Sequence, residues 1–154
     1  MHDNPLDRMT AWLREAMDAS QRDAEAATWH EDAGTWRAAA SEYATPSRPG
    51  GTRWYIEDSM EDGVITTVDP QASDDEGVAR HIARQSPAVV LRRIAADRKT
   101  LDLHAPITVE YDDNSPPTLA CRTCGSHFEY PTAWPCATLR LLAEGYGWTE
   151  EDRK

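Results

Sequence analysis

The sequence lacks the features that mark several large classes of protein. No apolar run approaches the roughly 20 residues needed to cross a bilayer, and residues 1–8 are polar and acidic rather than a hydrophobic leader. Basic residues are scarce, with 16 Lys and Arg against 27 Asp and Glu, for a net charge of −11. This balance disfavours nucleic acids and anionic membranes as partners, because both attract Lys and Arg. We therefore predict a cytoplasmic protein whose partner is another protein.

Cysteine is scarce as well, and the common motifs of catalysis are missing. Three cysteines cannot pair completely into disulfides, and in a reducing compartment they are more typical of metal ligands. The chain has no P-loop, no glycine-rich dinucleotide fingerprint, no H-E-x-x-H helix and no G-x-S-x-G turn. It also lacks the His-x-Glu element of zinc deaminases. An enzyme with an unrecognised site, built on His81 with Arg84 or on carboxylates near a hairpin, is therefore an alternative and not the main prediction.

The patterns that are present predict an α+β fold, with amphipathic helices around a small antiparallel β-hairpin or sheet. Asn4-Pro5 is typical of a helix start, and apolar residues at helical spacing extend this helix to about residue 27. Residues 53–56 and 64–68 are rich in β-forming side chains and flank an Asp-Gly turn signal, which predicts a hairpin. The alanine-rich stretch between the helix and the hairpin has no clear pattern.

The second half of the chain carries stronger helix signals. A short helix is predicted over 78–85, and a Ser-Pro pair starts a longer helix over 87–104. A short strand at 107–111 and a turn-rich segment precede a last helix, which Cys136 begins, and the charged tail is expected to fray beyond Trp148. We predict two regions within one compact domain, an N-terminal helix and β-hairpin region and a helical, zinc-binding region: 1–77 and 78–154.

The strongest local signal is a pair of cysteines three residues apart and followed by glycine, Cys121-Arg122-Thr123-Cys124-Gly125. Such a knuckle turns two thiolates toward one metal ion. Cys136 stands at a predicted helix start, where backbone N–H groups favour the thiolate over the thiol. A structural zinc site needs four tetrahedral ligands, and the chain has no fourth cysteine.

A histidine is therefore predicted to complete the site. His104 is favoured because it lies on the apolar face at the end of the long helix, before the knuckle. His127 and His81 stay open as alternatives, although His127 is only three residues after Cys124. We predict one structural Zn²⁺ per chain, held by a tetrad of three cysteines and one histidine: His104, Cys121, Cys124 and Cys136.

Charge is unevenly spread along the chain. Residues 79–104 hold six Lys and Arg against two Asp, whereas the flanking segments are acidic. We expect this basic segment to form ion pairs with the acidic N-terminal half, and contact with RNA or another anion is the alternative. Its basic residues are Arg80, Arg84, Arg92, Arg93, Arg98 and Lys99.

Several stretches together resemble one family. They are His81-Ile82-Ala83-Arg84-x-x-Pro87, His104-Ala105-Pro106, the knuckle, and Pro135-Cys136-Ala137-Thr138-Leu139-Arg140-Leu141-Leu142-Ala143. Through them the chain resembles an uncharacterised family of actinobacteria and their phages, domain of unknown function 6221, over roughly residues 1–145. Ser86 and Ala137 depart from the family's Asp and Pro but still suit helix starts, and the loop before the knuckle is longer. The resemblance implies the metal site and no known activity.

These observations favour a structural-zinc-stabilised protein-interaction module. The family resemblance implies that this module is a phage or mobile-element accessory protein. Six tryptophans support this prediction, because tryptophan is enriched at binding hot spots, although it also fills cores. An exposed tryptophan beside an acidic rim would favour a partner surface. The alternatives are the enzyme named above and an acidic nucleic-acid mimic or inhibitor of a host protein.

Overall fold

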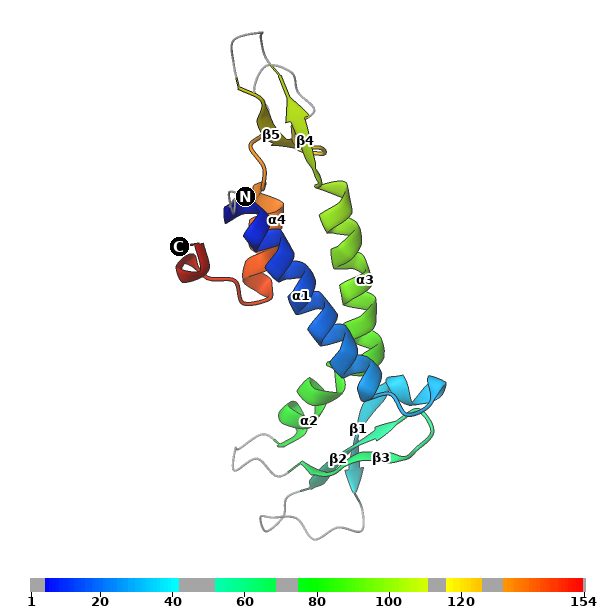
Figure 1. Cartoon of the computed structure of the whole chain (residues 1–154). Coiled ribbons are helices and arrows are strands. Elements are labelled where there is room, and N and C mark those ends of the chain that lie inside the picture. Colours follow the sequence, from blue (N-terminus) through cyan, green and yellow to red (C-terminus); the bar gives the residue numbers. More distant parts are fainter. Residues whose placement is uncertain (1–4, 42–51, 69–74, 111–115, 126–131, 154) are drawn as a thin grey trace. The chain divides into compact units, whose positions relative to one another are not determined.

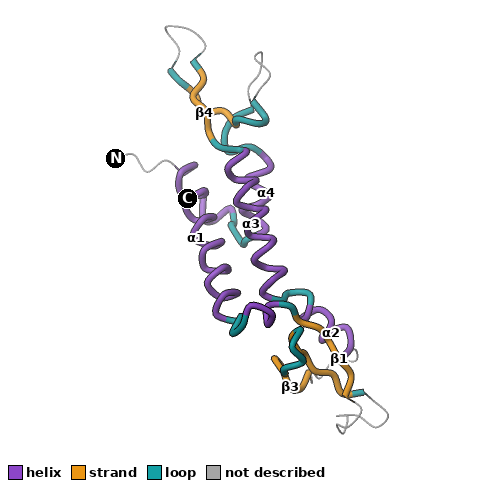
Figure 2. The backbone as a smooth tube through the Cα atoms, turned by 90° about the vertical axis from the view of Figure 1, so that its right-hand side faces the viewer, coloured by secondary structure: helices purple, strands orange, loops and turns teal. Residues whose placement is uncertain are grey.

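The computed structural model describes residues 5–41, 52–68, 75–110, 116–125 and 132–153, and its helices and small antiparallel sheets confirm the predicted α+β class (Figure 1, Figure 2). The helices are α1 (Pro5–Ala26), α2 (Asp75–Ala83), α3 (Pro87–Leu103) and α4 (Ala137–Gly145), with short 3-10 helices η1 (Glu31–Gly34) and η2 (Glu150–Arg153). The strands are β1 (Trp36–Ser41), β2 (Arg53–Asp58), β3 (Gly63–Val68), β4 (Pro106–Val109) and β5 (Thr118–Cys121).

Contacts within the chain divide it into two compact units, which are described separately. Unit 1 comprises Met1–Ala19 and Ile94–Lys154, and unit 2 comprises Ser20–Arg93. Both units are built partly from α1 and α3, because each helix contributes residues to both. The division of the sequence into 1–77 and 78–154 stays a prediction.

Unit 2 is built on a three-stranded antiparallel sheet in the order β1-β2-β3. The pairing of β2 with β3 confirms the predicted hairpin, and α2 packs against the sheet as the predicted short helix, starting three residues earlier than expected (Figure 1). Apolar side chains from the sheet and the helix meet in a small core of buried residues: Ile56, Val68, Ala79 and Ala83.

The first strand of this sheet was not predicted. Its centre is the run of alanines at 38–40, and alanine has little preference for strands, so local sequence carries no signal here. The strand forms because it pairs with β2 from Trp36↔Asp58 to Ser41↔Arg53, which places Trp36 against the core of unit 2. Tertiary pairing therefore decides the structure of a segment that propensity leaves open.

Unit 1 combines the N-terminal part of α1 with the C-terminal part of α3, the β4–β5 hairpin and α4. The helix that Pro5 begins follows the prediction closely, and its residues Met9, Leu13 and Met17, spaced four apart, are buried. On α4, Leu139 is fully buried. These side chains are among the buried apolar residues of unit 1.

Aromatic and polar contacts join the C-terminal segment to the other helices of unit 1. The rings of Trp12 on α1 and Trp148 meet edge to face with 5.2 Å between their centroids, and the Tyr146 hydroxyl donates to an Asp97 carboxylate oxygen on α3 at 2.7 Å. The tail that follows was expected to fray, and this expectation was wrong. It forms η2, because the Asp152 carboxylate accepts hydrogen bonds from both the backbone N–H and the hydroxyl of Thr149.

Two arginines of the basic segment form ion pairs with acidic residues. Arg98 on α3 pairs with Asp18 on α1 at 2.5 Å, as expected for an internal partner of the acidic N-terminal helix. Arg80 pairs with Glu76, which also belongs to the acidic N-terminal half, one turn away on its own helix. None of the helices in the described ranges has the length and apolar character that a bilayer crossing requires.

Candidate metal centre

His104 and Cys121 come together because of the register of the β4–β5 hairpin. Pro106 at the start of β4 pairs with Cys121 at the end of β5, and the backbone N–H of Arg122 donates to the carbonyl of Ala105 at 2.9 Å. The hairpin thus returns the chain to the end of α3, seventeen residues after the histidine. In this way two residues distant in sequence become neighbours through short-range pairing.

The knuckle places the second sulfur beside the first. The N–H of Gly125 donates to the carbonyl of Cys121 at 2.7 Å, and the N–H of Cys124 lies 3.5 Å from the Cys121 sulfur. A Cβ at residue 125 would lie 2.7 Å from the carbonyl oxygen of Cys121, closer than real side chains approach. Only glycine therefore fits this turn, as the Cys-x-x-Cys-Gly pattern indicated.

Gly125→Ala should disturb the turn that carries two of the four side chains. We expect a loss of about 1–3 kcal/mol in unfolding free energy, the usual cost of forcing an extra carbon into a filled space, because the obstacle is backbone. Zinc affinity should fall with it. Gly145→Ala, where an added Cβ meets nothing within 4 Å, is the matched control. Equal stability of the two variants in urea unfolding would contradict this reading.

Cys136 precedes the first residue of α4, as predicted, and its backbone is extended there. Burial by itself raises the pKa of this thiol, but the backbone N–H groups of Leu139 and Thr138 and the two neighbouring sulfurs outweigh it, so the net pKa is lowered. The peptide bond between Trp134 and Pro135, just before it, is cis. The surroundings of Cys136 thus favour the thiolate.

Trp134 and Thr123 were not singled out from the sequence, yet both hold the histidine end of α3 in place. The Trp134 indole N–H donates to the backbone carbonyl of His104 at 3.0 Å, and the Thr123 hydroxyl donates to the carbonyl of Leu103. Both bonds satisfy carbonyls that the end of a helix leaves without partners. No spacing rule connects these residues to the helix, so sequence reasoning had no signal for them.

All four predicted ligand side chains lie together, with their ligand atoms within 4.8 Å of one another. The imidazole Nδ1 of His104 is 3.3 Å from the sulfur of Cys121, 3.5 Å from that of Cys124 and 3.4 Å from that of Cys136. Bond lengths of about 2.3 Å for zinc–sulfur and 2.0–2.1 Å for zinc–nitrogen place such atoms about 3.6 Å apart on a tetrahedron. The arrangement therefore fits a metal of zinc's size and ligand preference.

The electrostatics of the cluster also call for a cation. Burial, reinforced by the two neighbouring sulfurs, raises the pKa of Cys124 to about 11. Thiols this close cannot all ionise without a positive charge among them, because each thiolate disfavours the next. Cys121 and Cys136 are buried and His104 and Cys124 are half-buried, so the cluster is largely screened from water.

The three histidines considered for the fourth position have different places. His104 provides the nitrogen that faces the sulfurs. His81 is exposed on α2 in unit 2, and His127 lies outside the described residues. A second group of metal-capable side chains, His30, Glu31 and Asp32, is exposed at the start of η1, which is common for acidic groups without any ion. It adds no site of its own.

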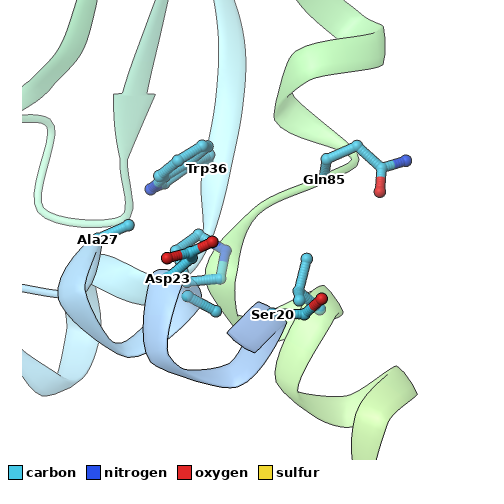
Figure 3. A pocket seen from close by; sticks show the side chains of 8 residues that line it. Ser20, Asp23, Ala27, Trp36 and Gln85 are labelled. Carbon is cyan, nitrogen blue, oxygen red and sulfur yellow. The ribbon is translucent and has the colours of Figure 1, made fainter. Parts of the chain in front are cut away.

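A shallow depression of about 330 Å³ lies beside the sheet of unit 2, between the C-terminal part of α1, β1 and the start of α3 (Figure 3). Of its polar lining residues, Asp23 and Gln85 are exposed and Ser20 is partly buried, and Trp36 lies at one side. Small-molecule sites usually bury most of the ligand and its polar anchors. The depression therefore does not compete with the cysteine cluster as a functional site.

The fold and the site together define an α+β protein with a Cys₃His cluster able to bind a metal ion. The chain belongs to DUF6221, a family of unknown function, whose profile matches residues 6–148. Neither a curated protein nor a solved structure matches the chain.

Proposed function

We propose that the chain binds one structural Zn²⁺ through His104, Cys121, Cys124 and Cys136. The observation that carries this proposal is the approach of one imidazole nitrogen to three sulfurs at 3.3–3.5 Å, from three separate segments of the chain. Four protein ligands complete a tetrahedral site and leave no position for substrate or water, which is the pattern of structural zinc and not of catalytic zinc. The metal would tie the end of α3, the hairpin and the start of α4 together.

We further propose that the zinc-stabilised fold is a protein-interaction module. The exposure of Trp29, 61 % of whose surface is accessible, supports a binding role over a core role for this tryptophan. The resemblance to actinobacterial and phage sequences is the only support for a phage or mobile-element accessory protein acting in the cytoplasm. The enzyme alternative gains little support from His81, since it is exposed and does not line the depression of about 350 Å³ that Arg84 lines.

Elemental analysis of protein purified from zinc-supplemented cells should find about one zinc per chain. His104→Ala should lose most of this zinc, because a three-sulfur site keeps an open position and a weaker hold on the metal. His127→Ala is the matched control and should retain zinc. Less than about a tenth of an equivalent in the unaltered chain would end the proposal, and zinc loss confined to the control would move the fourth ligand to His127.

A further inference from the structure

An exposed tryptophan is held in a fixed position on unit 2. Trp29, between α1 and η1, donates its indole N–H to a carboxylate oxygen of Asp58 at 3.2 Å, and Asp58 itself is fully buried. The ring is therefore anchored at its polar edge while most of its surface faces solvent. A rigid aromatic side chain loses little conformational entropy when a partner covers it, which is why such residues become hot spots.

The turn between β2 and β3 carries a second exposed apolar side chain, Met60, and the same Asp58 carboxylate links this turn to Trp29. The other carboxylate oxygen of Asp58 accepts hydrogen bonds from the N–H groups of Met60 at 2.8 Å and Asp62 at 3.1 Å. The Ser59 hydroxyl donates to the carbonyl of Asp32, which joins this turn to η1. Met60 is 42 % exposed. Asp58 thus orders both the tryptophan and the turn that carries the methionine.

Acidic side chains follow each of these two apolar residues closely in the sequence. Glu31, Asp32, Glu61 and Asp62 are all exposed, on the two segments that Asp58 and Ser59 join. Of the nearby side chains that can carry positive charge, the Arg37 guanidinium is already bonded to Glu57 at 2.5 Å and to Glu61 at 3.2 Å, and His30 Nδ1 lies 3.7 Å from an Asp32 carboxylate oxygen. We name this set the Trp29 surface, and it consists of Trp29, Glu31, Asp32, Met60, Glu61 and Asp62.

We propose that the Trp29 surface binds a partner segment in which Arg or Lys residues flank an apolar side chain. The carboxylates complement the cations, and the indole face attracts a guanidinium or ammonium group directly. The apolar residue would pack on the exposed surfaces of Met60 and Trp29, whose ring centroid also lies 5.9 Å from that of His30. This inference rests on the proposed interaction module and names the chemistry of its partner.

A peptide array read with the full zinc-loaded chain tests the proposal. The array holds peptides in which basic, neutral or acidic residues flank leucine, at near-physiological ionic strength. Basic peptides should be retained preferentially. Trp29→Ala should weaken their binding about thirtyfold, as at a hot spot, and the pair Glu31→Gln with Asp32→Asn about fivefold. Leu141→Ala, which removes an exposed apolar residue of unit 1, and Asp102→Asn with Glu110→Gln, which remove two exposed charges there, are the matched controls.

The outcomes separate this inference from the proposed function. Loss of basic-peptide binding in Trp29→Ala and in Glu31→Gln with Asp32→Asn, but not in the control variants, supports the inference. Equal losses in the control variants would show that the binding is not specific to the Trp29 surface, and this would overturn the inference. If neutral or acidic peptides are retained in a Trp29-dependent way, the proposed interaction module stands, but the inference of a basic partner is overturned. If no peptide of any class binds, both the inference and the proposed interaction module fail. Salt-sensitive self-association that Trp29→Ala abolishes would assign the surface to a second copy of this chain, and would also overturn the inference.

Discussion

Chelation of zinc is expected to abolish cooperative unfolding of unit 1 while the sheet of unit 2 keeps its structure. The strands of the β4–β5 hairpin are four residues each, and an isolated two-stranded hairpin is marginal in water. Apparent zinc-binding free energies of about 10–16 kcal/mol in zinc-finger peptides equal the whole stability of an ordinary domain, about 5–15 kcal/mol. Zinc binding would therefore determine whether the β4–β5 hairpin folds.

Amide hydrogen exchange of the zinc-loaded and chelated protein measures this directly. Protection in β4, β5 and α4 should fall sharply without metal, whereas protection around Ile56 in unit 2 should change little, because no ligand belongs to that unit. Unchanged protection in all three elements of unit 1 would show that zinc does not organise them.

Cys121→Ser should reproduce the effect of chelation, and Cys136→Ser should do so to a similar degree, since each removes one of four ligands. Arg122→Ala is the matched control for the first variant. Arg122 lies between the two knuckle cysteines with its side chain exposed, and its backbone bond to Ala105 survives the change. Zinc retention by Cys121→Ser, or zinc loss by Arg122→Ala, would contradict the assignment of the sulfur ligands.

The parts of this protein that could be predicted from sequence are those with local signals. Proline at the first helical position marks α1 and α3, because its missing N–H has no partner there in any case. The knuckle and Cys136 follow from spacing, and His104 follows from its predicted place at the end of the long helix. These local rules identified all four side chains of the cluster, although not the metal itself.

What the sequence could not show depends on pairing between distant segments. β5 consists of Thr118–Cys121 and lay at the edge of a segment read as turns, because its strand character comes from pairing with β4. The hydrogen bond from Trp134 to His104 spans thirty residues and leaves no trace in local spacing. Asp58 is a similar case, since Asp is typical of turns and its complete burial follows only from the contacts it makes.

Asp58→Ala is expected to be among the most destabilising substitutions in unit 2. The change would leave three donors without their acceptor: the indole N–H of Trp29 and the backbone N–H groups of Met60 and Asp62. Each buried donor that loses its partner costs about 1–3 kcal/mol, and partial access of water to the turn reduces the sum. We expect a loss of about 3 kcal/mol in unfolding free energy, measured by urea unfolding of the zinc-loaded chain.

Two further variants serve as comparisons for Asp58→Ala. Asp58→Asn keeps the volume and one acceptor oxygen, so it should cost roughly half as much. Asp62→Ala removes an exposed carboxylate four residues away and should stay within about 0.5 kcal/mol. Zinc content should be unchanged in all three, because Asp58 belongs to unit 2 and the cluster to unit 1. A stable Asp58→Ala variant that still binds basic peptides would show that Trp29 does not need its buried anchor. Loss of peptide binding with zinc retained would show instead that the anchor positions the surface.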